Sequence, residues 1–570
     1  MLTPNAIEIL EERYLLRDKK GVIHETPDQL FKRVASYIAS AEEEDLKGWE
    51  KKFYNLLSSL AFLPNSPTLM NAALPKGQLS ACFVLPVYDS LESIFKTLKD
   101  AALIHQSGGG TGYNFSRLRS KDELVTGSGG RSSGPVAFIK VYDTATEQVK
   151  QGGKRRGANM GILNIDHPDI EEFISCKSEG AELSNFNLSV GIKNEFFEAL
   201  KKDSDWVLRS PYDPKFVKKI SAKSLWNTIV YQAWKTGDPG ILFLDTINAN
   251  NPTPKLGVLE STNPCGEVPL LDYESCNLGS LNLTRILVRN TSKWDIDWNK
   301  LASHIALGIR FLDNVITMNH YVLPEIKEMS LGNRKIGLGI MGWAEVLILL
   351  GIPYASEEAV ALGEKIMAFI KTKSYETSAA LAKEKGSFPT WEKSILTRYG
   401  PLRNATCNSI APTGTISVIA NTSYSIEPLY ALAYTRSGIL GNKTQKEVSK
   451  LFVHKMEAEG LWTREIKKEV LATGSIQKIK GIPEELKNLF RTSLEIPWEY
   501  HLLHQQAFQK FTDNAVSKTV NLPKNSSIEE VSEIYLRAWE MGLKGITIYR
   551  DGSKEAQVLQ SCGFNTHTTC

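Results

Sequence analysis

Between residues 80 and 440 the sequence alternates between two patterns, and this alternation limits the possible folds more than any other property of the chain. Short apolar runs bounded by Gly, Pro, Asn or Ser alternate with stretches of helix-like periodicity. This alternation predicts an α/β fold with a central sheet or barrel. The strand-like runs include residues 82–88 (CFVLPVY), 112–118 (GYNFSRL), 186–192 (FNLSVGI) and 415–421 (TISVIAN).

The two ends of the chain differ from this central part. Residues 1–60 place apolar side chains at helical spacing, and Thr26 can cap a helix that has Pro27 at its first position. Residues 443–545 return to amphipathic helical patterns, and GITIYR then reads as a last strand. We therefore expect a helical region over 1–60, an α/β domain over 61–550 and a flexible polar tail over 551–570.

Composition excludes several classes of protein. The net charge of +3 in 570 residues leaves no broad basic surface for nucleic acid or anionic membrane. The first twenty residues carry acidic groups early and no sustained apolar run, so they do not resemble a signal peptide. The most apolar stretch, 336–352, contains Glu345 and four glycines, and its residues 344–350 predict a buried helix. We expect a soluble, cytoplasmic protein.

A glycine pattern in that apolar stretch needs a separate interpretation. Gly337, Gly339 and Gly342 match the spacing of a dinucleotide-binding loop, and a helical pattern follows them. The preceding residues, LGNRK, do not form an apolar strand, which such a loop requires. We therefore expect no nicotinamide or flavin site here.

Seven cysteines are scattered over the chain, at positions 82, 176, 265, 276, 407, 562 and 570. An odd number at wide spacing argues against a structural disulfide framework. Cys176 and Cys407 are interpreted as small buried residues without chemistry. The other five belong to segments that suggest function.

The most informative segment reads STNPCGEVPLLDYESCNLGS. Pro264 and Pro269 exclude a regular helix and favour extended backbone. Alternate side chains of an extended segment share one face, so Asn263, Cys265 and Glu267 are predicted to project together. An amide, a buried thiol and a carboxylate in one small volume would form a reaction centre. For a bare Cys-x-Glu pattern, a surface loop would be the simpler interpretation.

The wider pattern NPCGEVPLLDYESCNLGSLNL resembles the active-site loop of ribonucleotide reductases, in the spacing typical of their cobalamin-dependent class. The resemblance covers nearly the whole chain and implies a ten-stranded α/β barrel with the cysteine loop at its centre. Further segments resemble the family in the same order: ETPDQLFKRVA, LPNSPTLMNAALPKGQLSACFVLPVYDSLESI, QGGKRRGANMGILNIDHPDIEEFI, RKIGLGIMGWAE and NSIAPTGTISVIANTSYSIEP.

The resemblance implies a role for each catalytic residue. Cys265 would become a thiyl radical that abstracts the 3′ hydrogen of a ribose, and Glu267 would act as general base on the 3′-hydroxyl. Asn263 would hold the substrate hydroxyls. Cys82 and Cys276 would form the reducing pair, which requires Cα atoms within roughly 4.4–6.8 Å of each other.

The resemblance also implies sites for phosphate. Hydroxyl residues around a glycine leave backbone N–H groups free for an anion, above all at a helix N-terminus. In the family this turn binds the substrate phosphates, and another contact comes from the position of Ser66. The residues of the turn are Thr413, Gly414, Thr415 and Ile416.

A second nucleotide site is implied for dNTP effectors. Asp89 and Arg119 match the positions that hold the ribose and phosphates of the effector. No ATP-cone domain precedes the helical region, so we do not expect overall on/off control by ATP and dATP. A specificity loop would carry the effector signal to the substrate base, and it comprises Gly152, Gly153, Lys154, Arg155 and Arg156.

The predicted tail carries Cys562 and Cys570, which match the family's shuttle cysteines. They would pass electrons from a thioredoxin- or glutaredoxin-type reductant to the reducing pair. Together with His567 they could instead form a partial metal site. We expect no other metal.

The radical source distinguishes the classes of the family. Ile548 stands where the metal-dependent class has the first tyrosine of a relay, and the tail has no glycyl-radical motif. These differences favour class II, which uses adenosylcobalamin, and the length of the chain is similar to that of diphosphate reductases. The resemblance implies a homodimer. Two alternatives remain: a class I-type large subunit with a separate metal-radical subunit, and a catalytically silent nucleotide-binding regulator.

Overall fold

The N-terminal region folds into three helices, as its periodicity predicts. They are α1 (Pro4–Arg13), α2 (Pro27–Ala39) and α3 (Leu46–Ser58). Thr26 caps α2: its hydroxyl accepts a hydrogen bond from the Gln29 N–H, while the Gln29 side chain accepts one from the Thr26 N–H. This computed structural model describes residues 2–125, 129–151, 155–179, 182–213, 215, 217–291, 293–436, 445–553 and 559–561.

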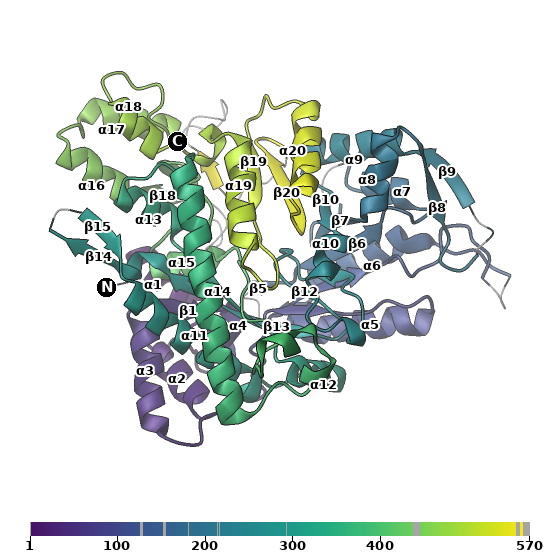
Figure 1. Ribbon diagram of the computed structural model, residues 1–570, viewed down its shortest axis with the longest axis horizontal. Coiled ribbons are helices and arrows are strands. Elements are labelled where there is room, and N and C mark those ends of the chain that lie inside the picture. The colour runs from purple at the N-terminus through teal and green to yellow at the C-terminus, as the bar shows by residue number, and fades with distance from the viewer. Residues whose placement is uncertain are drawn as a thin grey trace.

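A ten-stranded sheet forms the centre of the molecule (Figure 1). Its strand order is β1-β13-β2-β3-β6-β7-β10-β20-β19, and β16 pairs with β13. The strands are β1 (Phe62–Pro64), β2 (Cys82–Val84), β3 (Gly110–Asn114), β6 (Asn159–Asn164), β7 (Phe186–Ile192), β10 (Gly240–Phe243), β13 (Ser275–Asn282), β16 (Ile336–Met341), β19 (Thr519–Leu522) and β20 (Gly545–Arg550).

The sheet consists of two halves. Strands β2, β3, β6, β7 and β10 run parallel to one another, and in the other half β13 runs parallel to β16 and β19 to β20. The halves meet in antiparallel pairs at two places, β2 with β13 and β10 with β20. We call these two places the seams of the sheet.

An extended segment, residues 406–410, closes the sheet into a barrel. On one side Leu338 of β16 donates a backbone hydrogen bond to Cys407 (2.8 Å), and on the other Ile410 donates one to Ala515 (3.1 Å). Both contacts belong to parallel bridges, and the chain runs from Ala515 into β19. Nine of the ten strands and this segment thus form a closed ring, which confirms the predicted α/β barrel.

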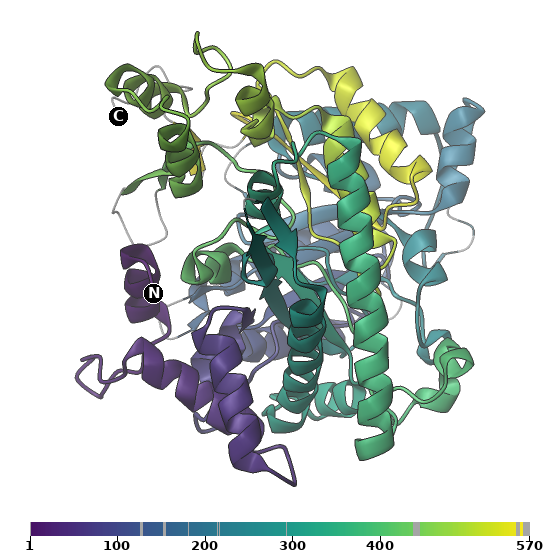
Figure 2. The same ribbon diagram turned by 60° about the vertical axis from the view of Figure 1, so that its left-hand side comes forward.

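Helices cover the outside of the ring. Figures 1 and 2 show α14 lying along the barrel, with α1–α3 packed at one end. One apolar core joins α1–α3 to α11, α14 and β16, and a second lies between the β2–β10 half and helices α5, α6, α9 and α20. The further helices are α4 (Ser66–Asn71), α5 (Leu91–Gln106), α6 (Gly134–Gln148), α7 (Ile170–Ser175), α8 (Asn194–Lys201), α9 (Ala222–Thr236), α10 (Leu244–Ala249), α11 (Trp298–Met318), α12 (Pro324–Asn333), α13 (Trp343–Leu350), α14 (Glu357–Lys385), α15 (Gly414–Ala420), α16 (Lys450–Ala458), α17 (Arg464–Thr473), α18 (Glu484–Leu489), α19 (Trp498–Gln509) and α20 (Ile528–Glu540).

Short strands form hairpins on the periphery of the barrel. The tail, expected to lack regular structure, contributes one of them: β21 pairs antiparallel with β17. The peripheral strands are β4 (Lys150–Gln151), β5 (Arg155–Arg156), β8 (Asp205–Arg209), β9 (Val217–Ser221), β14 (Leu287–Asn290), β15 (Lys293–Ile296), β17 (Ala433–Arg436), β18 (Gln445–Val448) and β21 (Leu559–Ser561).

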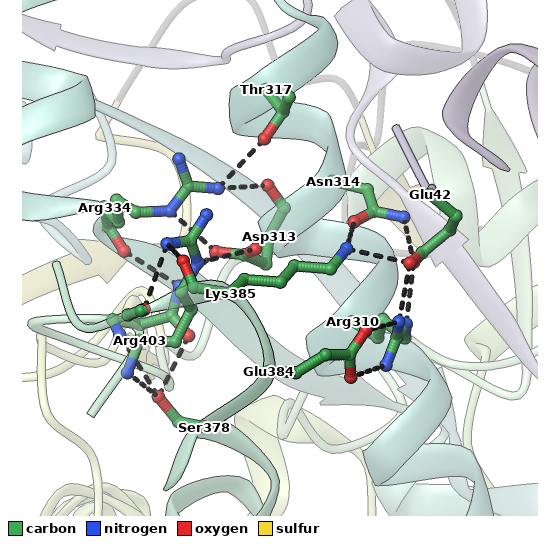
Figure 3. A network of polar contacts seen from close by, with 12 residues as sticks. Glu42, Arg310, Asp313, Asn314, Thr317, Arg334, Ser378, Glu384, Lys385 and Arg403 are labelled. Carbon is green, nitrogen blue, oxygen red and sulfur yellow. Dashed lines mark hydrogen bonds and ion pairs between the residues drawn. The ribbon is translucent and has the colours of Figure 1, made fainter. Parts of the chain in front are cut away.

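Buried ion pairs fasten the N-terminal region to the barrel helices (Figure 3). Glu42, which follows α2, accepts hydrogen bonds from Arg310 of α11 and Lys385 of α14. Burial raises the pKa of Glu42, but the bonds from these two cations outweigh it and lower the pKa to about 2. Beside this group, Asp313 binds Arg334 and Arg403.

The structure corrects one predicted strand. Residues 415–421 read as a strand because they are rich in β-branched residues, but they lie almost entirely in helix α15. Thr413 begins the helix in the left-handed region, at φ 57°, and Ile416 and Ile419 pack into the core beside α1. Tertiary packing here overrides local propensity.

The apolar stretch 336–352 has the structure that its composition predicts. Residues 344–350 lie in α13, and the glycine pattern before it lies within and just after β16 rather than in a loop that follows a strand. A Cβ at Gly339 would lie 2.3 Å from the Ser409 carbonyl oxygen. Only glycine at this position lets the segment 406–410 approach β16 and close the barrel. No helix of the described segments is long and apolar enough to cross a bilayer.

Candidate active site

The predicted active-site segment forms a hairpin loop, which we call the finger loop. It connects β11 (Ser261–Thr262) to β12 (Pro269–Leu270). The Gly266 N–H donates to the Asn263 carbonyl (3.1 Å), which closes a tight turn with Pro264 and Cys265 at its centre. The prediction of extended backbone over 263–267 is therefore wrong. The side chains come together through a turn instead of through alternation along a strand.

The finger loop lies inside the ring, because both halves of the barrel hold it. From β7, the Asn187 amide donates to the Pro264 carbonyl (2.8 Å). From the opposite half, the Ser409 hydroxyl and the Ala515 N–H donate to the Glu267 carbonyl, at 2.9 and 2.8 Å. The expected central position of the loop is confirmed.

Glycines of β3 make room for the loop. A Cβ at Gly112 would lie 1.7 Å from the Thr262 carbonyl oxygen, and one at Gly110 would lie 2.9 Å from the Pro264 ring. Only glycine permits this approach of two backbones. These glycines are not among the predicted site residues, although the run GGGTG is a visible signal in the sequence.

Asn263 lies at the base of the turn and is 2% exposed. Its side-chain oxygen accepts a hydrogen bond from the Val268 N–H (3.0 Å), and its side-chain NH₂ donates to the Cys82 sulfur (3.2 Å). One amide thus closes the loop and contacts a predicted reducing thiol.

Cys82 and Cys276 are directly opposite each other across the antiparallel pair β2–β13. The Cα atoms of such partners lie about 4.5–5.5 Å apart, which is within the range that a disulfide needs. Both side chains are buried, at 3% and 1% exposed, in an apolar cluster with Val268 of the finger loop. The structure therefore brings together two cysteines that are 194 positions apart in the sequence.

Glu267 is buried beside Asn263. It is 2% exposed, and its Oε2 has no hydrogen-bond partner among the described residues. Burial raises the pKa of this carboxyl to about 7, although the Asn263 side chain and the loop backbone lower it. A carboxyl with this pKa can accept a proton near neutral pH, as a general base must.

Cys265 occupies the tip of the turn, where its side chain is exposed. The expectation of a buried sulfur is therefore wrong. The side chain lines a cavity of about 420 Å³, which we call the β10–β20 cavity. The cause is the turn itself, which directs residue 265 into the cavity while residues 263 and 267 face the barrel wall.

The walls of the β10–β20 cavity contain residues that the sequence analysis missed. Gln505 is 1% exposed, and its side-chain oxygen has no partner in the described parts of the chain. The buried ammonium of Lys518 lies 2.5 Å from Glu427 and 3.0 Å from the His501 ring. No spacing in the sequence marks these residues, because β19, β20 and α19 bring them together only in the fold. The polar lining includes Asn187, Gln505, Lys518, Thr519, Asn521 and Tyr549.

The predicted phosphate turn lies next to this cavity. Pro412 lines the cavity, and the backbone of Gly414, Thr415 and Ile416 forms the first turn of α15. The Thr413 hydroxyl is bonded to the Ser417 hydroxyl (2.8 Å), so the backbone N–H groups are the free donors of this turn.

Ser66 stands at the start of a different helix, α4. Its hydroxyl is bonded to that of Tyr14, at 2.7 Å. Among the described residues, Ser66 makes no hydrogen bond to the α15 turn.

The predicted effector residues lie together at the start of α5. Arg119 binds Asp89 through its Nε (2.6 Å) and its backbone N–H (3.0 Å), and the Tyr212 ring centre lies 5.2 Å from the guanidinium carbon. Arg155 and Arg156 form β5, which pairs with β4 as a hairpin. Five predicted residues lie outside the described residues: Gly152, Gly153, Lys154, Cys562 and Cys570.

Comparisons with known proteins agree with this geometry. A family model described as the barrel domain of ribonucleotide reductase matches residues 80–400 and 396–549, and one described as the all-alpha domain of the same enzyme matches residues 1–77. A protein of Thermoplasma acidophilum named vitamin B12-dependent ribonucleoside-diphosphate reductase is 46% identical over 98% of this chain and 80% of its own length. A protein of the same name from Mycobacterium tuberculosis H37Rv is 46% identical over 97% of this chain and 78% of its own.

More distant relatives include proteins with other names. The ribonucleoside-diphosphate reductase subunit alpha of Chlamydia trachomatis is 31% identical over 96% of this chain and 58% of its own length. Among solved structures, the Actinobacillus ureae class Id ribonucleotide reductase alpha subunit superposes with a TM-score of 0.79 at 25% identity, covering 97% of both chains. The family models span nearly all of the chain and its relatives match it end to end, so this chain belongs to the ribonucleotide reductase family.

Proposed function

We propose that this chain reduces ribonucleoside diphosphates to 2′-deoxyribonucleotides by a thiyl-radical mechanism with adenosylcobalamin as the radical source. The relatives at 46% identity are named vitamin B12-dependent, whereas those near 30% identity include subunit alpha proteins as well as further vitamin B12-dependent reductases. One structural observation carries the proposal: Cys82, Cys276, Asn263 and Glu267 converge behind a turn that presents Cys265 to a cavity.

The residues around the turn account for the chemistry of the substrate. Cys265 takes the 3′ hydrogen atom of the ribose, while Glu267 accepts the proton of the 3′-hydroxyl. Asn263 holds the hydroxyls in place. The 2′-hydroxyl leaves as water, and the two electrons and two protons that replace the C–O bond by C–H come from Cys82 and Cys276. These two thiols become a disulfide. Cys265 returns the hydrogen atom to C3′ and Glu267 returns the proton to the 3′-oxygen, so atoms and electrons balance.

The polar lining of the β10–β20 cavity would hold the cofactor beside Cys265. When bound there, adenosylcobalamin would supply the radical chemistry that converts the Cys265 thiol to a thiyl. The buried side-chain oxygen of Gln505 is without a partner among the described residues and can accept a hydrogen bond there. Thr519 and Tyr549 line the same space. Strand β20 offers this one tyrosine, next to Ile548, in place of a tyrosine pair.

Two nucleotide sites follow from the positions of the other predicted residues. The free N–H groups of the α15 turn bind the substrate phosphates next to the cavity. A dNTP effector binds at Asp89 and Arg119, where its phosphates compete with Asp89 for the guanidinium. The specificity loop, with Arg155 and Arg156 in β5, transmits the identity of the effector base.

The partners include a second copy of the chain and a dithiol protein. Helix α5 follows Asp89 directly and exposes Leu91 (64%) and Phe95 (50%), while α6 exposes Val141 (40%). Exposed apolar side chains on neighbouring helices suit a homodimer interface. A thioredoxin- or glutaredoxin-type protein regenerates the reducing pair through Cys562 and Cys570.

An anaerobic assay of the purified chain tests the proposal. We expect deoxynucleotide from diphosphates when adenosylcobalamin and a dithiol are supplied and no second protein is added. Cys265→Ser should abolish product and leave effector binding unchanged, whereas Cys176→Ser, at a half-buried thiol remote from the finger loop in the sequence, should behave as the wild type. Ribonucleoside triphosphates are assayed in parallel, so that the rates with the two substrate classes can be compared.

The same assay separates the alternatives. Turnover that appears only with a metal-radical subunit would identify a class I-type large subunit. Binding of dNTP without product under every condition would identify a regulator on the same scaffold.

A further inference from the structure

A buried ion pair flanks the reducing cysteines inside the barrel. The Lys335 ammonium lies 2.6 Å from the Glu274 carboxylate, and the two side chains are 2% and 1% exposed. Glu274 lies two residues before Cys276 on β13. Lys335 directly precedes β16, whose first residue, Ile336, pairs with Asn277. Neither charged residue has a part in the mechanism above.

The register of three strands places the ion pair on the face that carries the thiols. Extending the parallel pairing of β13 and β16 by one residue sets Lys335 beside Cys276, which is itself opposite Cys82. Neighbours across a sheet project to the same side. Glu274 directly precedes β13 and joins this row through its ion pair with Lys335. The row Cys82, Cys276 and Lys335, with Glu274 next to it, therefore forms one buried cluster.

The charges of this cluster act on Cys276. Burial raises the pKa of this thiol above its ordinary range, and the Lys335 ammonium opposes that effect. Glu274 and Glu267 raise the pKa further, each by less than Lys335 lowers it. Lys335 is thus the one cation that favours the thiolate form of Cys276 in this cluster.

Stability alone does not account for Lys335. A buried ion pair is often no more stabilising than apolar residues of the same size. Glu274 also has other donors: the Leu271 N–H binds its Oε2 at 2.7 Å, and the Asn333 side chain binds its Oε1. These donors fix the carboxylate, and the carboxylate in turn holds the ammonium beside the redox pair.

We propose that Lys335, held by Glu274, is a positioning residue that stabilises Cys276 as the leaving thiolate when the Cys82–Cys276 disulfide is reduced. The inference rests on the proposed function. A thiolate of the incoming dithiol attacks the Cys82 sulfur, the bond between the two cysteines breaks, and its electron pair remains on Cys276. The second thiol of the dithiol then attacks its mixed disulfide with Cys82. The two protons of the dithiol end on Cys82 and Cys276, and the dithiol becomes a disulfide.

The exchange step can be measured without turnover. The full chain is oxidised with diamide and mixed with dithiothreitol, and the remaining Cys82–Cys276 disulfide is quantified by acid quench, alkylation and mass spectrometry. In Glu274→Gln/Lys335→Met, which leaves no unpaired charge, we expect reduction at pH 7 to slow by about fivefold, because the lost cation outweighs the lost anion at Cys276 and a higher pKa of the leaving thiol slows exchange. Lys335→Arg should stay within about threefold of the wild type.

A neighbouring ion pair provides the matched control. Arg334 and Asp313 lie 2.9 Å apart and are 6% and 1% exposed, but they belong to the network around α11 (Figure 3). Arg334→Met/Asp313→Asn should lose stability and retain the wild-type exchange rate. If the Glu274/Lys335 variant exchanges at the wild-type rate, or if the control slows equally, Lys335 has no redox role.

Two further readouts keep the interpretation clear. If Glu274→Gln/Lys335→Met does not fold, Glu274→Gln/Lys335→Gln replaces it and must show the same slowing. Absence of deoxynucleotide from the wild-type chain would refute the proposed function, whereas the exchange rates test Lys335 whether or not product forms.

Discussion

The side-chain amide of Asn263 donates a hydrogen bond of 3.2 Å to the sulfur of Cys82, which lies on a different structural element. Asn263 stands on the finger loop, and Cys82 stands on the barrel wall in β2. The same side chain closes the loop through its bond from the Val268 N–H. The orientation of a reducing thiol is thereby coupled to the shape of the turn that carries Cys265.

Replacing Asn263 tests this coupling. In Asn263→Ala the loop loses its internal bond and Cys82 loses its donor, so we expect product formation to fall about 100-fold, as is usual when reacting groups are misplaced by about 1 Å. The free energy of unfolding should fall by about 1–3 kcal/mol, because the Val268 N–H is left without its acceptor. Single-turnover product assays and denaturant unfolding measure the two effects. Wild-type activity in the variant would show that the bond to Cys82 is incidental.

Glu267→Gln removes the proposed general base while keeping size and polarity. We expect a loss of about 100-fold or more in the rate of product formation, the usual contribution of such a base. The pH profile adds a second test. Because the pKa of Glu267 is raised to about 7, the wild-type rate should rise as the pH passes through that value. A rate independent of pH between 6 and 8 would argue against the role.

The same carboxyl links stability to pH, with a defined sign. Its pKa in the folded chain, about 7, is above the ordinary 4.5, so folding favours the protonated form. Its stabilising contribution is complete below about pH 4.5 and is lost as the pH rises through 7. Glu267→Gln should therefore be more stable than the wild type at pH 8, by on the order of 3 kcal/mol, and equal to it at pH 4.5. Denaturant unfolding at both pH values measures the difference.

Gly112→Ala tests the close approach of β3 and the finger loop. The new Cβ would lie 1.7 Å from the Thr262 carbonyl oxygen, so the loop must shift. We expect activity to fall by about 100-fold or more and the free energy of unfolding by about 1–3 kcal/mol. Gly332→Ala is the control, since its Cβ meets only the Thr390 methyl at 3.5 Å within a helix. This variant should keep full activity and gain up to about 1 kcal/mol.

Charges on the exposed face of α5 test the proposed homodimer. Leu91 and Phe95 are one helical turn apart, and both are at least half exposed in the single chain. Leu91→Glu/Phe95→Glu should convert the dimer to a monomer in light-scattering measurements, because two buried carboxylates per subunit are costly to desolvate. Val22→Glu, at a 59% exposed residue of the N-terminal region, is the control and should leave the dimer intact. A wild-type chain that is monomeric at all concentrations would contradict the proposal.

Much of the fold is predictable from local pattern. The cap of α2 at Thr26, the buried helix over residues 344–350 and the strand at 545–550 follow from spacing and composition. The region 415–421 does not, because β-branched residues favour a strand until packing against α1 makes a helix the better solution.

The active site, like the fold, could be predicted only in part from local pattern. Residues 263–267 are recognisable as reactive from their types, but the turn between Asn263 and Gly266 is set by contacts from Asn187, Ser409 and Ala515, which lie in other parts of the sequence. The pairing of Cys82 with Cys276 is likewise a property of strand register. Lys335 gives no local signal at all, because its significance arises only from the strand beside it.

The two seams of the barrel have a mechanical consequence. One seam, β2 with β13, holds the sulfur pair, and the other, β10 with β20, borders the cavity at Cys265. The finger loop spans the space between them, fastened to both halves. A slide of one half-barrel against the other would therefore change the spacing at both sulfur centres together. A substitution far from both centres can alter the contact between the two halves. It should then impair hydrogen abstraction and thiol oxidation together.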